Sequence, residues 1–325
     1  MKKNVILYKN IPEEKRKILE QEFNLFYFDG INEDNIKSFL RVLKIADGMI
    51  GASKKIPKEW IEQAPNLKAI STISVGYDNF DLDILNQRNI RLMHTPDVLT
   101  DTTADTIFML LLMTARRAVE LSLLIKEKKW NKSIGSQYYG NDVHHKTIGI
   151  VGMGRIGKSV AQRAFCGFNM KIIYTSNRRN TEAEQLFQAT YASLDELLIQ
   201  SDFVCLTLPL LPTTEKLISK EKINLMKSSA ILINASRGKI VDEKALIEAL
   251  KNKTIKAVGL DVFEVEPLSL DSPLLALDNV VLLPHIGSAT QETRNLMVDC
   301  AINNLIMALK PDKPKKNLVN IMQVS

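Results

Sequence analysis

Three residues in the second half of the chain combine a carboxylate-binding cation with a possible acid–base pair. Arg237 follows a predicted strand, and a guanidinium there can hold a carboxylate through two parallel hydrogen bonds. His285 follows another, and imidazole is the side chain best suited to give up a proton near neutral pH. Glu266 also lies beyond a strand, and a carboxylate beside imidazole favours the protonated ring. Residue types alone leave a surface arginine and a packed or solvated histidine open as alternatives.

A glycine-rich turn directly follows the apolar strand predicted at 147–151 and opens a helix predicted at 158–168. In such a G-x-G-x-x-G turn the first glycine allows the tight bend, the second allows a pyrophosphate to approach the backbone, and the third brings helix and strand together. The helix N-terminus then faces the negative charge. Glycines that cluster by chance would not be expected between a strand and a helix in this order, so the context favours a dinucleotide-binding turn. The candidate cofactor contacts in the turn are Gly152, Gly154, Arg155, Ile156 and Gly157.

The segment after the next predicted strand, 171–175, indicates which dinucleotide is bound. In NAD-binding domains an acidic residue about 20 residues beyond the glycine turn accepts hydrogen bonds from the ribose 2′-hydroxyl. Here no acidic residue occurs between that strand and Glu182. Adjacent arginines in a loop are often simply solvated, but at this strand end they could bind a 2′-phosphate, so NADPH is expected over NADH. The candidate contacts are Ser176, Asn177, Arg178 and Arg179.

The elements that must position these residues alternate between strand and helix, which predicts two α/β domains. We expect a Rossmann dinucleotide-binding domain at 104–286, inserted into a flavodoxin-like α/β substrate domain formed by 1–103 and the returning segment 287–325. A long, largely apolar helix should run from residue 102 towards 130, and a final helix should span about 288–309. The strands expected in the first domain are 5–8, 25–28, 47–51, 67–74 and 90–94; those in the second are 147–151, 171–175, 203–208, 230–235, 257–262 and 280–283.

Composition agrees with a folded protein of about two domains, since 325 residues include 45% apolar and 25% charged residues. The longest apolar stretch, 106–115, is too short to cross a bilayer, and no signal-peptide core is recognised, so we expect a cytoplasmic protein. The three cysteines lack metal spacing and are expected to be reduced and buried. The net charge of +6 is spread along the chain, which favours an anionic small ligand over nucleic acid.

Motifs distributed over the whole chain resemble those of the D-isomer-specific 2-hydroxyacid dehydrogenases, and within them the glyoxylate/hydroxypyruvate reductases that are also called 2-ketogluconate reductases. About 150 residues precede the glycine turn, whereas in L-specific lactate and malate dehydrogenases the cofactor domain comes first. Besides the turn, the segments that carry the resemblance are 74–78 (SVGYD), 98–101 (VLTD), 143–146 (VHHK), 233–238 (INASRG), 259–267 (GLDVFEVEP) and 283–290 (LPHIGSAT).

The resemblance assigns a role to each matching position. It implies that Arg237 binds the substrate, that Glu266 and His285 form the acid/base pair, and that His285 also contacts the substrate. It implies that backbone N–H groups of Val75 and Gly76 hold the substrate carboxylate from the first domain. The implied cofactor contacts beyond the glycine turn and the arginine loop are Ala235, Arg237, Asp261, which would touch the nicotinamide carboxamide, and Gly287.

The expected activity is NADPH-dependent reduction of glyoxylate, hydroxypyruvate and 2-keto-D-gluconate to D-2-hydroxy acids, with His285 as proton donor and NADH as a possible substitute. Two alternatives stay open: a phosphoglycerate dehydrogenase-like enzyme, and a nucleotide-sensing protein like the corepressors that share this fold. The former often carries regulatory domains, and the latter an interaction tail, that the chain is not expected to have. We expect a homodimer, joined through the apolar helix after residue 102, without metal, membrane or nucleic acid as partner.

Overall fold

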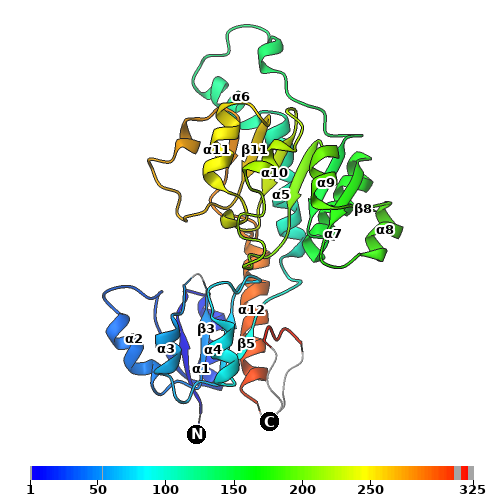
Figure 1. The fold of residues 1–325 in the computed structure, drawn as a ribbon. Coiled ribbons are helices and arrows are strands. Elements are labelled where there is room, and N and C mark those ends of the chain that lie inside the picture. Colours follow the sequence, from blue (N-terminus) through cyan, green and yellow to red (C-terminus); the bar gives the residue numbers. More distant parts are fainter. Residues whose placement is uncertain (1, 53, 311–315, 321–325) are drawn as a thin grey trace. The chain divides into compact units, whose positions relative to one another are not determined.

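The computed structural model describes residues 2–52, 54–310 and 316–320. The chain forms two compact units, one made of residues 1–99 with 290–325 and the other of residues 100–289. These limits lie a few residues from the domain boundaries expected from the sequence. Each unit contains its own parallel sheet (Figure 1).

The first unit has a five-stranded parallel sheet in the order β2-β1-β3-β4-β5. This is the flavodoxin-like order that was expected. Helix α12 (Gln291–Ala308), orange in Figure 1, returns from the far end of the sequence and packs against β3, β4 and β5. The strands are β1 (Asn4–Leu7), β2 (Asn24–Tyr27), β3 (Gly48–Gly51), β4 (Ala69–Thr72) and β5 (Arg91–Met93); the other helices are α1 (Glu13–Glu22), α2 (Ile36–Leu43), α3 (Lys58–Glu62) and α4 (Leu82–Gln87).

The second unit has a seven-stranded parallel sheet in the order β12-β11-β10-β9-β6-β7-β8. The order outward from β6 is that of a Rossmann sheet, so the predicted fold class is confirmed. The six predicted strands are present as β6 (Thr147–Val151), β7 (Lys171–Thr175), β9 (Phe203–Leu206), β10 (Ile231–Asn234), β11 (Ala257–Leu260) and β12 (Val280–Leu282). The prediction missed β8 (Thr190–Tyr191), whose two residues are both exposed and give no apolar signal.

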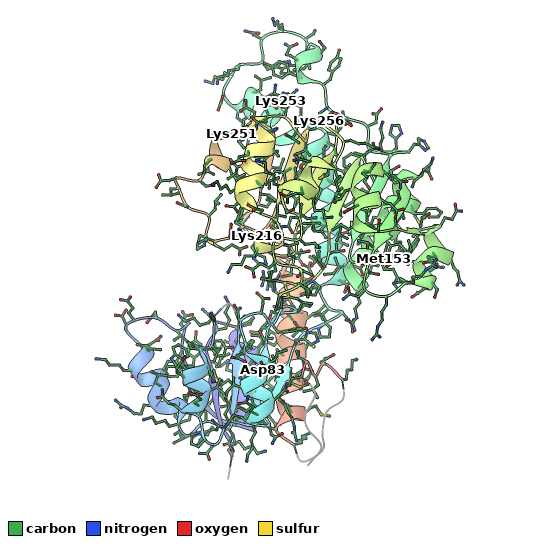
Figure 2. The ribbon with its side chains drawn as sticks, viewed as in Figure 1. Asp83, Met153, Lys216, Lys251, Lys253 and Lys256 are labelled. Atoms are coloured by element: carbon green, nitrogen blue, oxygen red, sulfur yellow. The ribbon has the colours of Figure 1, made fainter. Side chains whose placement is uncertain are left out.

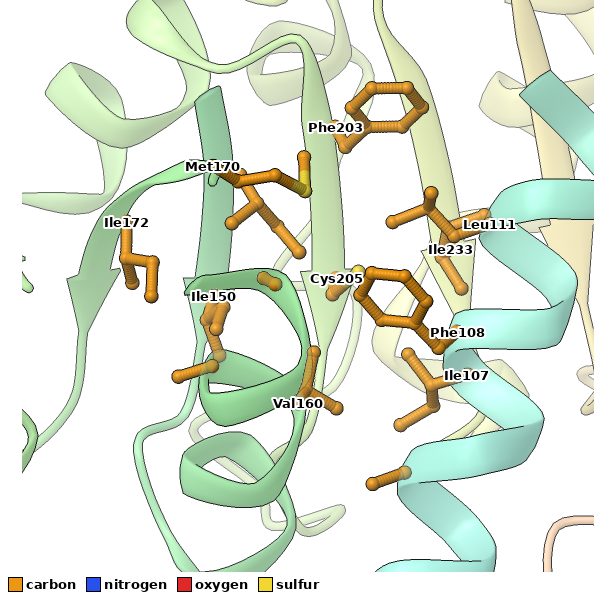
Figure 3. Close-up of a cluster of buried hydrophobic side chains, with 14 of the residues drawn as sticks. Ile107, Phe108, Leu111, Ile150, Val160, Met170, Ile172, Phe203, Cys205 and Ile233 are labelled. Carbon is orange, nitrogen blue, oxygen red and sulfur yellow. The ribbon is translucent and has the colours of Figure 1, made fainter. Parts of the chain in front are cut away.

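Helix α5 (Thr100–Ala115) covers one face of this sheet, and its buried side chains form much of the core (Figure 3). Phe108 and Leu111 of α5 lie in one cluster with Ile150, Cys205 and Ile233, one from each of the central strands β6, β9 and β10. On the same face α5 also packs against α7 (Arg155–Gln162). Helix α5 therefore packs against the helix that the glycine turn opens and against strands β10, β11 and β12.

The prediction of one continuous helix from 102 towards 130 was wrong. Helix α5 ends at Ala115, and a separate α6 (Ala118–Lys126) follows it. Arg117, between them, has φ of 53°, which lies in the left-handed region and cannot continue a helix. Its guanidinium forms two hydrogen bonds with the carboxylate of Glu120, at 2.8 and 2.7 Å, and these hold the bend.

The remaining helices of the second unit are α8 (Thr181–Phe187), α9 (Leu194–Gln200), α10 (Lys220–Asn224) and α11 (Glu243–Lys251). Several lysines at and beyond the end of α11 are exposed, including Lys251, Lys253 and Lys256 (Figure 2). Among the described residues, no helix is long and apolar enough to cross a membrane.

The three cysteines are free, as expected, but they are not all buried. Cys205 is fully enclosed in β9, where burial raises the pKa of its thiol to about 12. Cys300 is partly buried, and Cys166 is exposed. Cys166 lies in a π-helical turn (Arg163–Gly167) that extends α7, so the prediction that it is buried was wrong.

Candidate active site

The turn after β12 is held by a buried carboxylate from the end of β11. Asp261 is fully buried and accepts hydrogen bonds from the backbone N–H groups of Ile286, at 2.7 Å, and Gly287, at 2.8 Å. Burial raises the pKa of Asp261, and these two N–H groups oppose the rise only in part. The residue just before them, His285, has φ of 55°, a backbone conformation that costs energy unless its surroundings enforce it. Asp261 thus fixes the turn that presents His285.

His285 and Glu266, the two residues predicted to form an acid–base pair, are hydrogen bonded to each other. The imidazole Nδ1 lies 2.7 Å from Oε2 of Glu266, and because a carboxylate accepts, Nδ1 carries the hydrogen. The other oxygen of Glu266 accepts from the Phe263 N–H at 3.1 Å. Burial alone would raise the pKa of Glu266, but the hydrogen bonds from His285 and Phe263 and the nearby positive charges outweigh it, so the pKa is lowered. Glu266 is therefore ionised at neutral pH and orients the ring with Nε2 on the opposite side.

Arg237 lies beside this pair because its loop packs directly on the backbone next to Glu266. The loop follows β10, and a Cβ at Gly238 would lie only 1.8 Å from the Phe263 carbonyl carbon. Glycine is therefore required at 238, and the close approach brings Arg237 near enough for its charge to lower the pKa of Glu266. One guanidinium nitrogen donates to the Ser236 carbonyl at 2.8 Å. The structure thus brings Arg237, Glu266 and His285 together at the carboxyl end of the Rossmann sheet.

The glycine turn has the geometry that a dinucleotide pyrophosphate requires. Gly152 has φ of 103°, and a Cβ at Gly157 would lie 2.1 Å from the Gly152 carbonyl oxygen, so both positions need glycine. A Cβ at Gly154, by contrast, would meet nothing within 4 Å, which leaves open space over the turn. Gly154 is also the N-cap of α7 and offers no side chain to cap it. The first-turn N–H groups can therefore bind a phosphate, and the residues fit the expected cofactor.

The loop after β7 contains an ion pair that the sequence analysis missed. Two of the three guanidinium nitrogens of Arg179, Nε and Nη2, donate to the Glu184 carboxylate, each at 3.0 Å. These hydrogen bonds, together with one from Tyr174 and the positive charge of Arg179, lower the pKa of Glu184. The Arg179 guanidinium also lies 5.6 Å from the centre of the Tyr191 ring. Tyr191 belongs to β8, the strand that was missed.

Arg178 is exposed in the same loop, and no side chain in the described part of the chain pairs with its guanidinium. The two arginines are therefore not equivalent. The signal that could have revealed Glu184 is Asn180, which caps α8 and places residues 182 and 184 in the helix's first turn. Met153, labelled in Figure 2, lies in the glycine turn, and its carbonyl accepts from the Asn180 amide at 2.9 Å.

The other predicted contacts lie at the same strand ends or in the first unit. Ser176 and Asn177 follow β7, Ala235 follows β10, and Gly287 donates to Asp261. Val75 and Gly76, the predicted carboxylate-binding residues, lie in the first unit, in the turn after β4.

A Rossmann sheet with an open glycine turn, and a Glu–His pair beside an arginine at its carboxyl end, defines an oxidoreductase that uses a nicotinamide cofactor. Residues 108–287 match the family described as D-isomer specific 2-hydroxyacid dehydrogenase, NAD binding domain. A glyoxylate/hydroxypyruvate reductase B from Serratia proteamaculans is 56% identical over 320 residues, which cover 98% of each chain. The protein therefore belongs to the D-isomer specific 2-hydroxyacid dehydrogenase family.

Solved structures agree over nearly the whole chain. A protein from Thermus thermophilus is 37% identical with a TM-score of 0.88, and the match covers 97% of this chain and 99% of that one. An NADPH-dependent glyoxylate/hydroxypyruvate reductase from Sinorhizobium meliloti, solved with NADP and malonate, is 28% identical with a TM-score of 0.86 and covers 98% and 97%. The family and fold predicted from the sequence are confirmed.

Proposed function

We propose that this protein reduces small 2-oxo acids to D-2-hydroxy acids with NADPH as the hydride donor. Glyoxylate and hydroxypyruvate are the principal substrates, and 2-keto-D-gluconate is a further one. The names of the relatives support the first two substrates, and the complex of the Sinorhizobium meliloti relative with NADP supports the cofactor. The observation that carries the proposal is the hydrogen bond of 2.7 Å between Glu266 and His285 next to Arg237.

The chemistry follows from the charges of these residues. When bound, the nicotinamide cofactor supplies the hydride. Arg237 binds the carboxylate and carbonyl of the 2-oxo acid and stabilises the negative charge that develops on the carbonyl oxygen. His285 donates the proton from Nε2 to that oxygen, and ionised Glu266 stabilises the imidazolium beforehand. Backbone N–H groups of Val75 and Gly76 bind the carboxylate from the first unit.

Substrate preference follows from the polar character expected for this site. The turn at 74–77 contains hydroxyl and glycine residues, which suit small hydroxylated acids better than a bulky apolar side chain. We therefore expect hydroxypyruvate to have a higher kcat/KM than phenylpyruvate. The segment 130–139, which the sequence also suggested for this site, lies near the C-terminal end of α5, where the Gln137 carbonyl accepts from Arg117, and the following Asn141 contacts Lys256 just before β11. The segment therefore lies at the amino end of the Rossmann sheet and not beside His285.

Initial rates with glyoxylate, hydroxypyruvate, 2-keto-D-gluconate, pyruvate and phenylpyruvate, each with NADPH and NADH, test the proposed function. Preference for phenylpyruvate would overturn the substrate assignment, and no turnover with any acid would favour a nucleotide-sensing role.

We expect a homodimer, but α5, the helix predicted to join it, buries most of its apolar side chains in its own unit. Within the predicted region, the exposed apolar side chains lie mainly on the following helix, α6, and just beyond it. None of the residues of α6 is buried, and Leu123, Ile125 and Trp130 have exposed fractions of 47, 58 and 57%. Such a surface is usually covered by another chain. Light scattering should give twice the chain mass of 36.6 kDa. A monomer at micromolar concentration would contradict this prediction. The neighbouring surface of α5 and the π-helical turn has an apolar depression lined mainly by Phe108, Met109, Leu112, Met113 and Phe168.

A further inference from the structure

We propose that His94 is a positioning residue for substrate binding, which holds the turn at 74–76 through the Val75 carbonyl. This inference rests on the proposed function, in which the N–H groups of Val75 and Gly76 bind the substrate carboxylate. The imidazole Nδ1 of His94 lies 3.0 Å from the Val75 carbonyl oxygen. Because a carbonyl only accepts, Nδ1 donates, and this fixes the tautomer as well as the ring orientation.

The turn is bonded in a way that leaves its N–H groups available. All three of its carbonyl oxygens accept hydrogen bonds: Ser74 from the Thr95 N–H at 2.9 Å, Val75 from His94, and Gly76 from the Ser74 hydroxyl at 2.6 Å. In the described part of the chain, no group accepts from the N–H of Val75 or Gly76. The Val75 carbonyl and the Gly76 N–H belong to the same planar peptide and point in opposite directions. The hydrogen bond from His94 to this carbonyl therefore sets the direction of the Gly76 N–H, one of the two proposed donors to the carboxylate.

His94 is itself held on both sides by asparagines from the end of the chain. Its N–H donates to the Asn317 carbonyl at 3.1 Å, and its carbonyl accepts from the Asn304 side chain at 2.7 Å. The Asn317 side chain donates to the Asn304 amide oxygen at 3.0 Å, which joins the two supports. Asn304 lies in α12 and is buried. The ring of Tyr77 also contacts the imidazole edge-on, with centroids 6.0 Å apart. The imidazole is thus a fixed donor and not a mobile surface side chain.

Two substitutions separate the donated hydrogen bond from the size of the side chain. His94→Leu keeps an apolar side chain of similar size but removes the donor, whereas His94→Asn keeps an amide nitrogen at the position of Nδ1. We expect His94→Leu to raise KM for hydroxypyruvate about tenfold, with a smaller change in kcat and none in KM for NADPH, because a misdirected N–H weakens carboxylate binding. His94→Asn should restore most of the loss.

Two results with the His94 variants would contradict the proposal. An unchanged KM for hydroxypyruvate in His94→Leu overturns the proposal, and so does an equal rise in both variants, which would mean that shape matters and not the donor. If His94→Leu does not fold, Asn304→Ala replaces it and should raise the same KM about threefold; no rise overturns the proposal. If the native protein reduces none of the acids, the proposed function fails. Calorimetric titration of oxalate in the presence of NADPH then tests the role of His94 separately. Weaker oxalate binding by His94→Leu alone supports the proposal, and no binding by the native protein overturns it.

Discussion

His285→Ala is expected to lower kcat for hydroxypyruvate reduction by about 10²- to 10⁴-fold, the usual contribution of a general acid. The substitution removes the proton donor but leaves the glycine turn and Asp261 in place, so the Kd for NADPH, measured by fluorescence titration, should stay close to the native value. The left-handed backbone at His285 does not favour Ala, and circular dichroism is therefore the necessary control for folding. Nearly native turnover in a folded His285→Ala variant would show that another group delivers the proton.

Glu266→Gln tests the other half of the acid/base pair through kcat. The lowered pKa of Glu266 means that its carboxylate is negative throughout the neutral range, so it can stabilise the positive charge of a proton-donating imidazole. Gln has the same size and can still accept from Nδ1, but it lacks the charge, so kcat for hydroxypyruvate should fall by about tenfold or more while KM for NADPH stays close to the native value. A folded Glu266→Gln variant with native kcat would refute the pairing.

Arg178→Ala should raise KM for NADPH at least about tenfold while KM for NADH changes little, because a charge-assisted hydrogen bond to the 2′-phosphate is lost. Arg178 is exposed, whereas Arg179 already donates to Glu184. Arg179→Ala is the matched comparison: it removes a cation and releases the negative charge of Glu184 beside the phosphate. We expect Arg179→Ala also to weaken NADPH binding, and Glu184→Gln to restore part of that loss.

Salt gives an independent reading of the same interaction. Added salt should weaken the binding of NADPH more than that of NADH, because only NADPH has a 2′-phosphate for the exposed arginine to attract. Salt screens attraction between exposed charges, with a screening length of about 10 Å at 0.1 M ionic strength. A native enzyme that uses NADH at least as efficiently as NADPH would show that this loop does not select the cofactor. Equal increases of both KM values in Arg178→Ala would mean that Arg178 contacts a part common to both cofactors.

Much of the fold could be predicted because each buried strand leaves an apolar run in the sequence. Strands β6, β9, β10 and β11 are nearly or wholly buried, and the sequence predicted all four. The missed strand β8 has two exposed residues and pairs only with β7, so its position depends on tertiary contacts. The break at Arg117 was missed because no proline or glycine marks it, and only the left-handed backbone of this residue interrupts the helix.

The candidate site was predictable where strand ends determine it and not where side chains choose partners. Glu266 and His285 follow adjacent strands, β11 and β12, so their meeting follows from the sheet order. The pairing of Arg179 with Glu184 depends on a helix that was not predicted in detail, and the arginine loop was therefore interpreted as two equivalent cations. The double hydrogen bonding of Asp261 to the turn at 286–287 likewise depends on a backbone geometry that residue types do not reveal.

The most direct test of the central claim is the product that the native enzyme forms from hydroxypyruvate and NADPH, identified by chiral chromatography. The predicted result is D-glycerate in an amount equal to the NADPH oxidised, with a higher kcat/KM for NADPH than for NADH and almost none formed by His285→Ala. L-glycerate, or NADPH oxidation without any glycerate, would contradict the account.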